Sequence, residues 1–110
     1  EAFLTALTAS GLPMDRFVYL GFLPLKKCRK TLINALKDEK RTIIFYESPH
    51  RILRTLEELS QTLPEKTQLV LARELTKIHE EFLRGSFDSV LKELRSRPSI
   101  KGEIVILLHV

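Results

Sequence analysis

The sequence predicts an α/β protein with a mixed, mostly parallel sheet of about five strands, flanked by helices. Two short, continuously apolar runs, 42–46 and 68–72, are typical of strands covered on both faces. A helical pattern separates them, and strand, helix and strand together span about 30 residues, as in a βαβ unit with a right-handed crossover. Helical and strand-like segments also alternate along the rest of the chain.

Length and composition indicate one globular domain, residues 1–110, with 44% hydrophobic and 29% charged residues. The one cysteine, Cys28, is expected on a helix as a small apolar residue, and no His or Cys spacing indicates a metal site. The sequence has neither a signal-type segment nor an apolar run of roughly 20 residues, so we expect a cytoplasmic location without membrane contact. The net charge of +4 is compatible with an anionic partner such as nucleic acid, although many basic domains bind no anion.

The first predicted elements are a helix over 2–10 and a strand over 16–23. Gly11 suits the position after the helix, and Gly21 predicts a bulge in the strand. Because no N-cap precedes the helix, we expect an upstream portion outside this chain.

The next predicted helix, 26–39, begins with four cations, Lys26, Lys27, Arg29 and Lys30. Cations at this end oppose the helix macrodipole. They indicate either a polyanion contact or an ordinary solvated surface.

The strand at 42–46 leads into Ser48, a predicted N-cap, and Pro49, a suitable first helical residue. After the strand at 68–72, a short strand is expected at 81–85. Ser86 is predicted to cap a helix over 87–94, and residues 103–110 form a final strand.

Polar side chains follow the two buried strands where their carboxyl ends are expected, the edge at which α/β proteins bind ligands. The first cluster holds Tyr46, Glu47, Ser48, His50 and Arg51, and the second holds Arg73, Glu74, Thr76, Lys77, His79, Glu80 and Glu81. Two clusters on one edge can serve acid–base chemistry or hold a charged ligand. Each member also has an ordinary structural explanation, as a helix cap, a surface ion pair or a surface histidine.

These clusters carry a resemblance to a known family. The segments 45–51 (FYESPHR) and 72–85 (ARELTKIHEEFLRG), with 4–24 and 101–107, resemble the C-terminal half of bacterial ribosomal RNA small subunit methyltransferase I, of the tetrapyrrole methylase superfamily. The resemblance implies the C-terminal domain of that fold, in a homodimer whose N-terminal domain is absent from this chain. It also implies S-adenosylmethionine as cofactor and 2′-O-methylation of a cytidine in small-subunit rRNA, without a metal.

The resemblance assigns roles to particular residues. Cofactor contacts are expected from Tyr46, Glu47, Ala72, Arg73, Gly102 and Glu103. The candidate catalytic residues are Glu47, His50, Glu74 and His79 as bases, with Lys77 lowering the pKa of the ribose hydroxyl. RNA phosphates are expected at Lys26, Lys27, Arg29, Lys30, Arg51 and Arg73.

Two alternatives remain open from the sequence. The chain could be a non-catalytic RNA-binding or dimerisation module, or it could belong to a methylase that acts on a tetrapyrrole. The second alternative is less favoured, because the carboxylates of Glu47, Glu74, Glu80 and Glu81 would repel an anionic tetrapyrrole.

Overall fold

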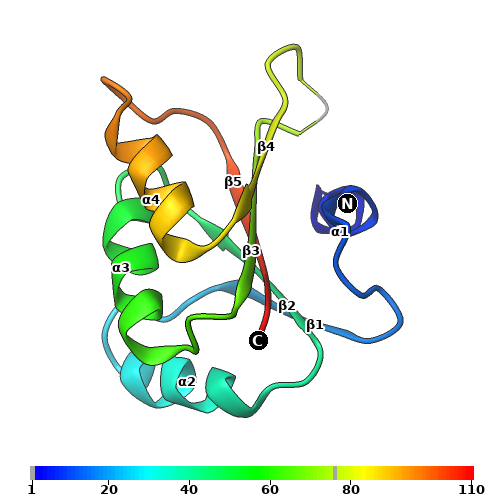
Figure 1. Ribbon diagram of the computed structural model, residues 1–110, viewed down its shortest axis with the longest axis vertical. Coiled ribbons are helices and arrows are strands. Elements are labelled where there is room, and N and C mark those ends of the chain that lie inside the picture. The colour runs from blue at the N-terminus through cyan, green and yellow to red at the C-terminus, as the bar shows by residue number, and fades with distance from the viewer. Residues whose placement is uncertain (1, 76) are drawn as a thin grey trace.

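The computed structural model describes residues 2–75 and 77–110, which form one five-stranded sheet with helices on both faces (Figure 1). The elements in chain order are α1 (Ala2–Ser10), β1 (Phe17–Phe22), α2 (Arg29–Ala35), the 3₁₀ turn η1 (Leu36–Asp38), β2 (Thr42–Glu47), α3 (Ile52–Thr62), β3 (Gln68–Arg73), β4 (Glu81–Gly85), α4 (Phe87–Arg95) and β5 (Ile104–His109). The strand order is β1-β2-β5-β3-β4. The predicted α/β class, strand number and flanking helices are confirmed.

The sheet is mixed as predicted, but the prediction that it is mostly parallel was wrong, because most of its strand pairs are antiparallel. Only β1 and β2 pair in parallel among the described strands, and β5 runs antiparallel between β2 and β3. The strands of the predicted βαβ unit therefore point the same way but are not neighbours. A continuous apolar run reports that a strand is covered on both faces and does not report the direction of its neighbour.

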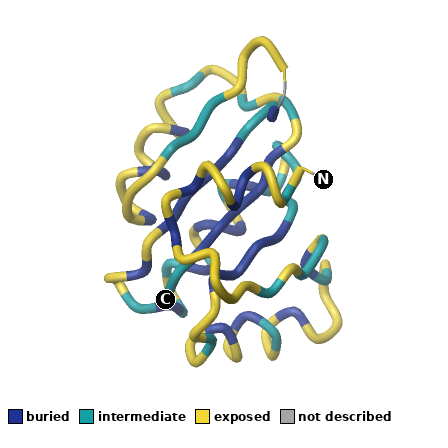
Figure 2. The backbone as a smooth tube through the Cα atoms, turned by 90° about the vertical axis from the view of Figure 1, so that its right-hand side faces the viewer, coloured by how far each residue is buried: buried dark blue, intermediate teal, exposed yellow. Residues whose placement is uncertain are grey.

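Two apolar layers sandwich the sheet. Helices α2, α3 and α4 lie on one face and α1 lies on the other (Figure 1). Successive residues of β2 serve opposite layers, since Phe45 packs with Leu56 beneath α3 whereas Ile44 packs with Leu7 of α1. Figure 2 shows the strands buried through the middle of the molecule, with exposed backbone mainly on the helices and loops around them. The core therefore fixes the sheet rigidly and leaves the loops at the strand ends to form a site.

Two predicted glycine positions and one predicted cap are confirmed. Gly11 follows α1 with φ 79°, and Gly21 has φ 65° where the β1–β2 register shifts. Positive φ of this kind favours glycine. The Ser86 hydroxyl accepts a hydrogen bond from Ser89 N at 3.1 Å and caps α4.

Two other local predictions were wrong. Helix α3 begins at Ile52, and Ser48 contributes its carbonyl, which accepts hydrogen bonds from Arg51 N and Ile52 N at 3.1 Å each, instead of a capping hydroxyl. The expected cap geometry is lost because a turn separates Ser48 from the helix. Cys28 is exposed, with φ 68°, and lies just before α2.

The helices of this fold are short compared with a membrane-spanning helix. Within residues 2–75 and 77–110, every helix is too short or too polar to cross a membrane.

Candidate functional site

The candidate site is a cleft of about 570 Å³ where β2 and β3 end and β5 begins. Ile104, the first residue of β5, is the register partner of both Glu47 and Arg73. The prediction that the two polar clusters share one edge of the sheet is therefore confirmed. The lining residues are Ala2, Phe22, Tyr46, Glu47, Ser48, Pro49, Leu75, Lys77, Gly102, Glu103, Ile104 and Val105.

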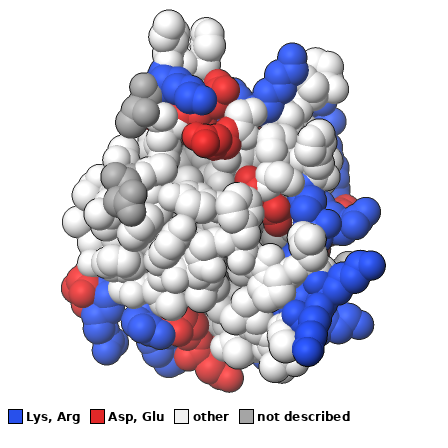
Figure 3. Space-filling model, turned by 180° about the vertical axis from the view of Figure 1, so that it is seen from behind, with Lys and Arg blue, Asp and Glu red and all other residues white. Residues whose placement is uncertain are grey.

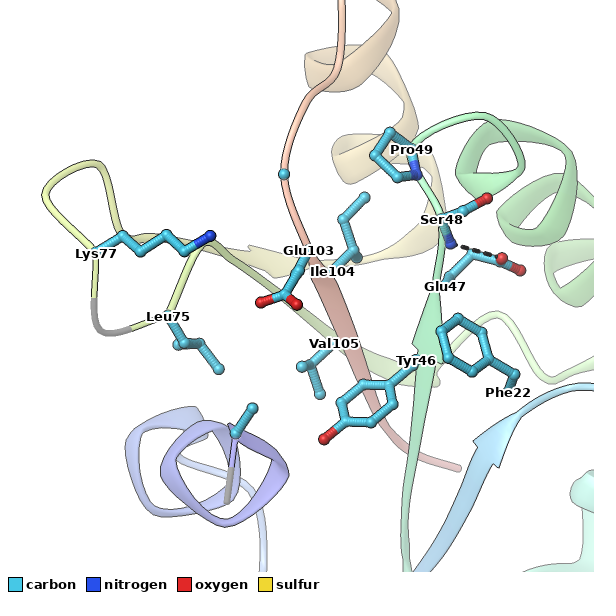
Figure 4. Close-up of a pocket in the computed structure, with 12 residues that line it drawn as sticks. Phe22, Tyr46, Glu47, Ser48, Pro49, Leu75, Lys77, Glu103, Ile104 and Val105 are labelled. Atoms are coloured by element: carbon cyan, nitrogen blue, oxygen red, sulfur yellow. Dashed lines mark hydrogen bonds between the residues drawn. The ribbon is translucent and has the colours of Figure 1, made fainter.

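The cleft has an apolar wall and two charged side chains at its rim (Figure 4). The rings of Phe22 and Tyr46 lie 5.7 Å apart and form one side. The side chains of Lys77 and Glu103 extend into the space between the β3–β4 loop and β5 (Figure 4). An apolar pocket with a few convergent polar groups is the usual form of a small-molecule site.

Gly102 lies in the α4–β5 loop, just before β5, where this loop packs against the start of the β3–β4 loop. Its φ is 93°, and a Cβ at this position would lie 2.2 Å from Cγ of Glu74. The Glu74 backbone is itself left-handed, with φ 51°, and its N–H donates to the Glu103 carbonyl at 3.0 Å. The two loops therefore meet so closely that only glycine fits at position 102 without displacement.

Glu47 is buried, with 6% of its surface exposed, and its carboxylate has two partners. Oε1 accepts a hydrogen bond from Ser48 N at 2.8 Å, and Oε2 accepts one from the Thr55 hydroxyl at 2.6 Å. In Figure 4 the side chain is directed away from Glu103 and Lys77. Glu47 therefore supports the backbone of the cleft wall, and its carboxylate is not directed into the cleft.

Arg73 belongs to an ion-pair cluster outside the cleft lining. It donates to Glu81 Oε1 at 3.1 Å and to the Lys101 carbonyl at 2.6 Å. Arg97 donates hydrogen bonds to both carboxylate oxygens of Glu81, at 2.7 Å to Oε1 and at 2.6 Å to Oε2. Hydrogen bonds from Arg97, and to a lesser extent from Arg73, hold the pKa of Glu81 at about 2 although burial opposes this shift.

Other predicted site residues are less close to the cleft. His50 and His79 are exposed, and neither lines the cleft. Ala72, with 1% of its surface exposed, packs in the apolar layer on the α1 face. Glu1 and Thr76 lie outside the described residues.

The predicted RNA contacts separate into two groups. Lys26, Lys27 and Lys30 are exposed, and Arg51 is half-buried, with an Nε that has no hydrogen-bond partner among the described residues. Arg29 differs from the expectation, because it is only 6% exposed and its donors are taken by groups of the protein itself. A buried, paired guanidinium does not suit a phosphate contact, so we assign Arg29 to the interior.

Sequence reasoning missed several apolar members of the lining, among them Phe22, Leu75 and Val105. Phe22 could have been found, since it ends a strand parallel to β2 and the rule of carboxyl ends applies to it too. Val105 could not be found from the residue pattern alone, because a continuous apolar run does not show which of its side chains will face a cleft. Among the described residues, no group of three or more His, Cys, Asp or Glu side chains could hold a metal ion.

Comparison with known proteins defines the class to which this fold and cleft belong. Residues 1–91 match the family of tetrapyrrole (corrin/porphyrin) methylases, and the chain belongs to this family. A ribosomal RNA small subunit methyltransferase I from Hydrogenobaculum sp. (strain Y04AAS1) is 47% identical over 107 residues, which cover 97% of this chain and 46% of that protein. The chain thus spans less than half of this relative.

Two solved structures show the same fold at low sequence identity. A cobalt precorrin-4 methyltransferase of cobalamin biosynthesis matches with a TM-score of 0.67 and 19% identity, over 98% of this chain and 47% of that one. A uroporphyrin-III C-methyl transferase from Thermus thermophilus, complexed with S-adenyl homocysteine, matches with a TM-score of 0.58 and 13% identity, over 93% of this chain and 48% of that one.

Proposed function

We propose that this chain is the C-terminal domain of an S-adenosylmethionine-dependent methyltransferase whose N-terminal domain lies outside residues 1–110. The proposed reaction is methylation of a cytidine ribose 2′-hydroxyl in small-subunit ribosomal RNA. One observation carries the proposal: the two polar motifs meet at a single cleft with an apolar wall. The name of the relative with 47% identity supports the RNA substrate.

The residues of the cleft fit S-adenosylmethionine. Tyr46, Phe22 and Val105 offer aromatic and aliphatic surface for a purine ring. The Glu103 carboxylate is placed to accept hydrogen bonds from ribose hydroxyls or an ammonium group. When bound, the cofactor supplies a methyl group on a positively charged sulfur. The structural neighbour complexed with S-adenyl homocysteine supports this choice of ligand.

Two of the five predicted catalytic residues, Glu47 and Lys77, line the cleft. Lys77 is the better placed, because its side chain extends toward Glu103 whereas that of Glu47 is directed away from it (Figure 4). Its ammonium group would stabilise the negative charge that develops on the ribose oxygen as the proton leaves. Glu47 is disfavoured as the base because both of its oxygens already accept hydrogen bonds. Glu74, His50 and His79 stay as candidate proton acceptors.

Exposed cations next to α2 supply the proposed RNA contact. In Figure 3 Lys and Arg side chains gather over the end of the molecule where Figure 1 places α2. Lys26, Lys27 and Lys30 belong to this region, and we keep them with Arg51 as phosphate contacts. We drop Arg29 and Arg73 from this set, since both are engaged within the domain.

The homodimer also remains a proposal. Phe17 and Tyr19 of the edge strand β1 are 37% and 40% exposed, and aromatic surface of this kind supports association. Sedimentation of the full-length protein measures it, and a monomer at micromolar concentration would contradict it. A cytoplasmic location stays a prediction, as does the alternative of a non-catalytic module.

The test is methyl transfer by the full-length protein that contains this chain. Tritiated S-adenosylmethionine and small ribosomal subunits are the substrates, and mass spectrometry locates 2′-O-methylcytidine in the product. We expect Lys77→Ala to lower kcat about a hundredfold. Lys92→Ala, an exposed lysine on α4, is the matched control and should leave the rate unchanged. Absence of transfer by the unmodified protein would overturn the proposed reaction.

A further inference from the structure

We propose that Arg29 and Thr55 are positioning residues for the cofactor. Together they fix the Glu47 carboxylate, which in turn holds the backbone of Ser48 in the lining of the cleft, here called the Ser48 rim. This inference rests on the proposed function, since it concerns the same cleft.

The rim at Ser48 is irregular backbone between β2 and α3, so its position depends on hydrogen bonds. Its N–H donates to Glu47 Oε1 at 2.8 Å, and its carbonyl accepts from Arg51 N and Ile52 N. Ser48 and the following Pro49 both line the cleft. The Glu47 carboxylate therefore sets the direction in which the chain leaves β2 along the wall.

The Thr55 hydroxyl connects Glu47 to Arg29 in one defined orientation. Thr55 is completely buried, and its Oγ1 lies 2.6 Å from Glu47 Oε2 and 3.0 Å from Nη2 of Arg29. Arginine can only donate, so the one hydroxyl hydrogen must be given to Glu47. Arg29 thus donates to Thr55 and Thr55 donates to Glu47, so the first bond strengthens the second. Ser48 N donates to the other oxygen of the same carboxylate, and Glu47 is therefore the shared acceptor that links this series to the cleft.

Arg29 is the buried cation at the start of this chain. Its Nε donates to Glu58 Oε1 at 2.9 Å, and its Nη1 donates to the Pro24 carbonyl at 2.8 Å. Arg29 therefore joins three parts of the fold: the segment before α2, the helix α3 and, through Thr55, the end of β2.

The arrangement fits a positioning role better than a purely stabilising one. A buried ion network is seldom more stable than apolar side chains of equal volume, because desolvation offsets its Coulomb energy. The core beside it is already closed by apolar residues such as Ile52 and Leu56, both completely buried. The feature that apolar residues could not supply is a fixed acceptor for Ser48 N at the cleft.

The test uses the full-length protein with three threonine variants. Thr55→Val keeps the shape and removes the hydroxyl, whereas Thr55→Ser keeps the hydroxyl. Thr67→Val is the matched control, because Thr67 is buried and its hydroxyl has no partner among the described residues. Calorimetry with S-adenosylmethionine gives Kd, amide hydrogen exchange reports on Ser48, and thermal unfolding gives Tm.

We expect Thr55→Val to raise the Kd and KM for S-adenosylmethionine roughly tenfold, the lower end of the loss observed when an outer hydrogen-bond partner of a metal ligand is removed. Exchange of the Ser48 amide should accelerate at least tenfold. Thr55→Ser should bind within about threefold of the unmodified protein, and Thr67→Val should equal it.

The outcomes separate this inference from the proposed function. A lower Tm for Thr55→Val with unchanged Kd and unchanged Ser48 exchange would show a merely structural role and overturn the inference. Absence of S-adenosylmethionine binding by the unmodified protein would instead overturn the proposed function. Faster Ser48 exchange in Thr55→Val would in that case still support the coupling from Thr55 to the rim.

Discussion

Substitution of Gly102 by alanine is expected to loosen the contact between the β3–β4 loop and β5. The new Cβ would lie 2.2 Å from Cγ of Glu74 and 2.6 Å from its Cδ and Oε1, distances that require a shift. Gly102 also has φ 93°, a conformation that alanine adopts only with strain. Two separate penalties therefore act at one position.

The magnitude follows from these two penalties. The backbone strain costs about 1–2 kcal/mol for a residue with a side chain. Rotation of Glu74 away from the new methyl group would sacrifice its 3.6 Å ion pair with Arg73, worth at most about 1 kcal/mol. We expect a total loss of about 1–3 kcal/mol, a sizeable part of the roughly 5–15 kcal/mol that stabilises a domain.

Urea unfolding of the chain measures this loss. Gly11→Ala is the matched control, since Gly11 has φ 79° but a Cβ there would meet nothing within 4 Å, so only the backbone strain remains. In a Glu74→Ala background, which already lacks the ion pair with Arg73, Gly102→Ala should cost only the backbone strain, about as much as Gly11→Ala. Equal losses for Gly102→Ala in the presence and in the absence of the Glu74 side chain would show that the two loops are not packed this closely.

Two further predictions concern charged groups. The pKa of Glu81 is lowered from 4.5 to about 2, so its stabilising contribution is complete above pH 4.5 and is lost as the pH falls toward 2. Glu81→Gln should therefore be less stable than the unmodified chain by about 1–2 kcal/mol at pH 6, and nearly as stable at pH 2, as measured by urea unfolding. A difference in unfolding free energy that stays the same at both pH values would contradict the ion-pair cluster. The triple variant Lys26→Ala, Lys27→Ala, Lys30→Ala should bind rRNA more weakly. The slope of log K against log salt concentration should become shallower by about 2, because each phosphate contact contributes about 0.7. An unchanged slope in filter binding would show that these lysines do not contact the RNA.

Local chain chemistry explains why several elements could be predicted. The capping hydroxyl of Ser86, the positive φ of Gly11 and the bulge at Gly21 depend on neighbours within a few residues, which the sequence displays directly. The shared edge of the two polar motifs was also predictable, because it depends only on β2 and β3 pointing the same way.

The features that the sequence did not reveal depend on partners far along the chain. β5 pairs between β2 and β3, and nothing in an apolar run shows which strand will lie beside it. Arg29 looks like one of four surface cations, yet its partners Thr55 and Glu58 lie more than 25 residues away. Burial of a cation becomes predictable only when its counter-charges are placed in three dimensions.

The proposed cofactor site is tested most directly by a crystal structure of the full-length protein with S-adenosylhomocysteine, the product of methyl transfer from the proposed cofactor. If the cleft holds the cofactor, the ligand will contact Tyr46, Leu75 and the Gly102–Glu103 segment of this domain. Electron density for the ligand at another position, with these residues untouched, would contradict the assignment of the cleft as the cofactor site.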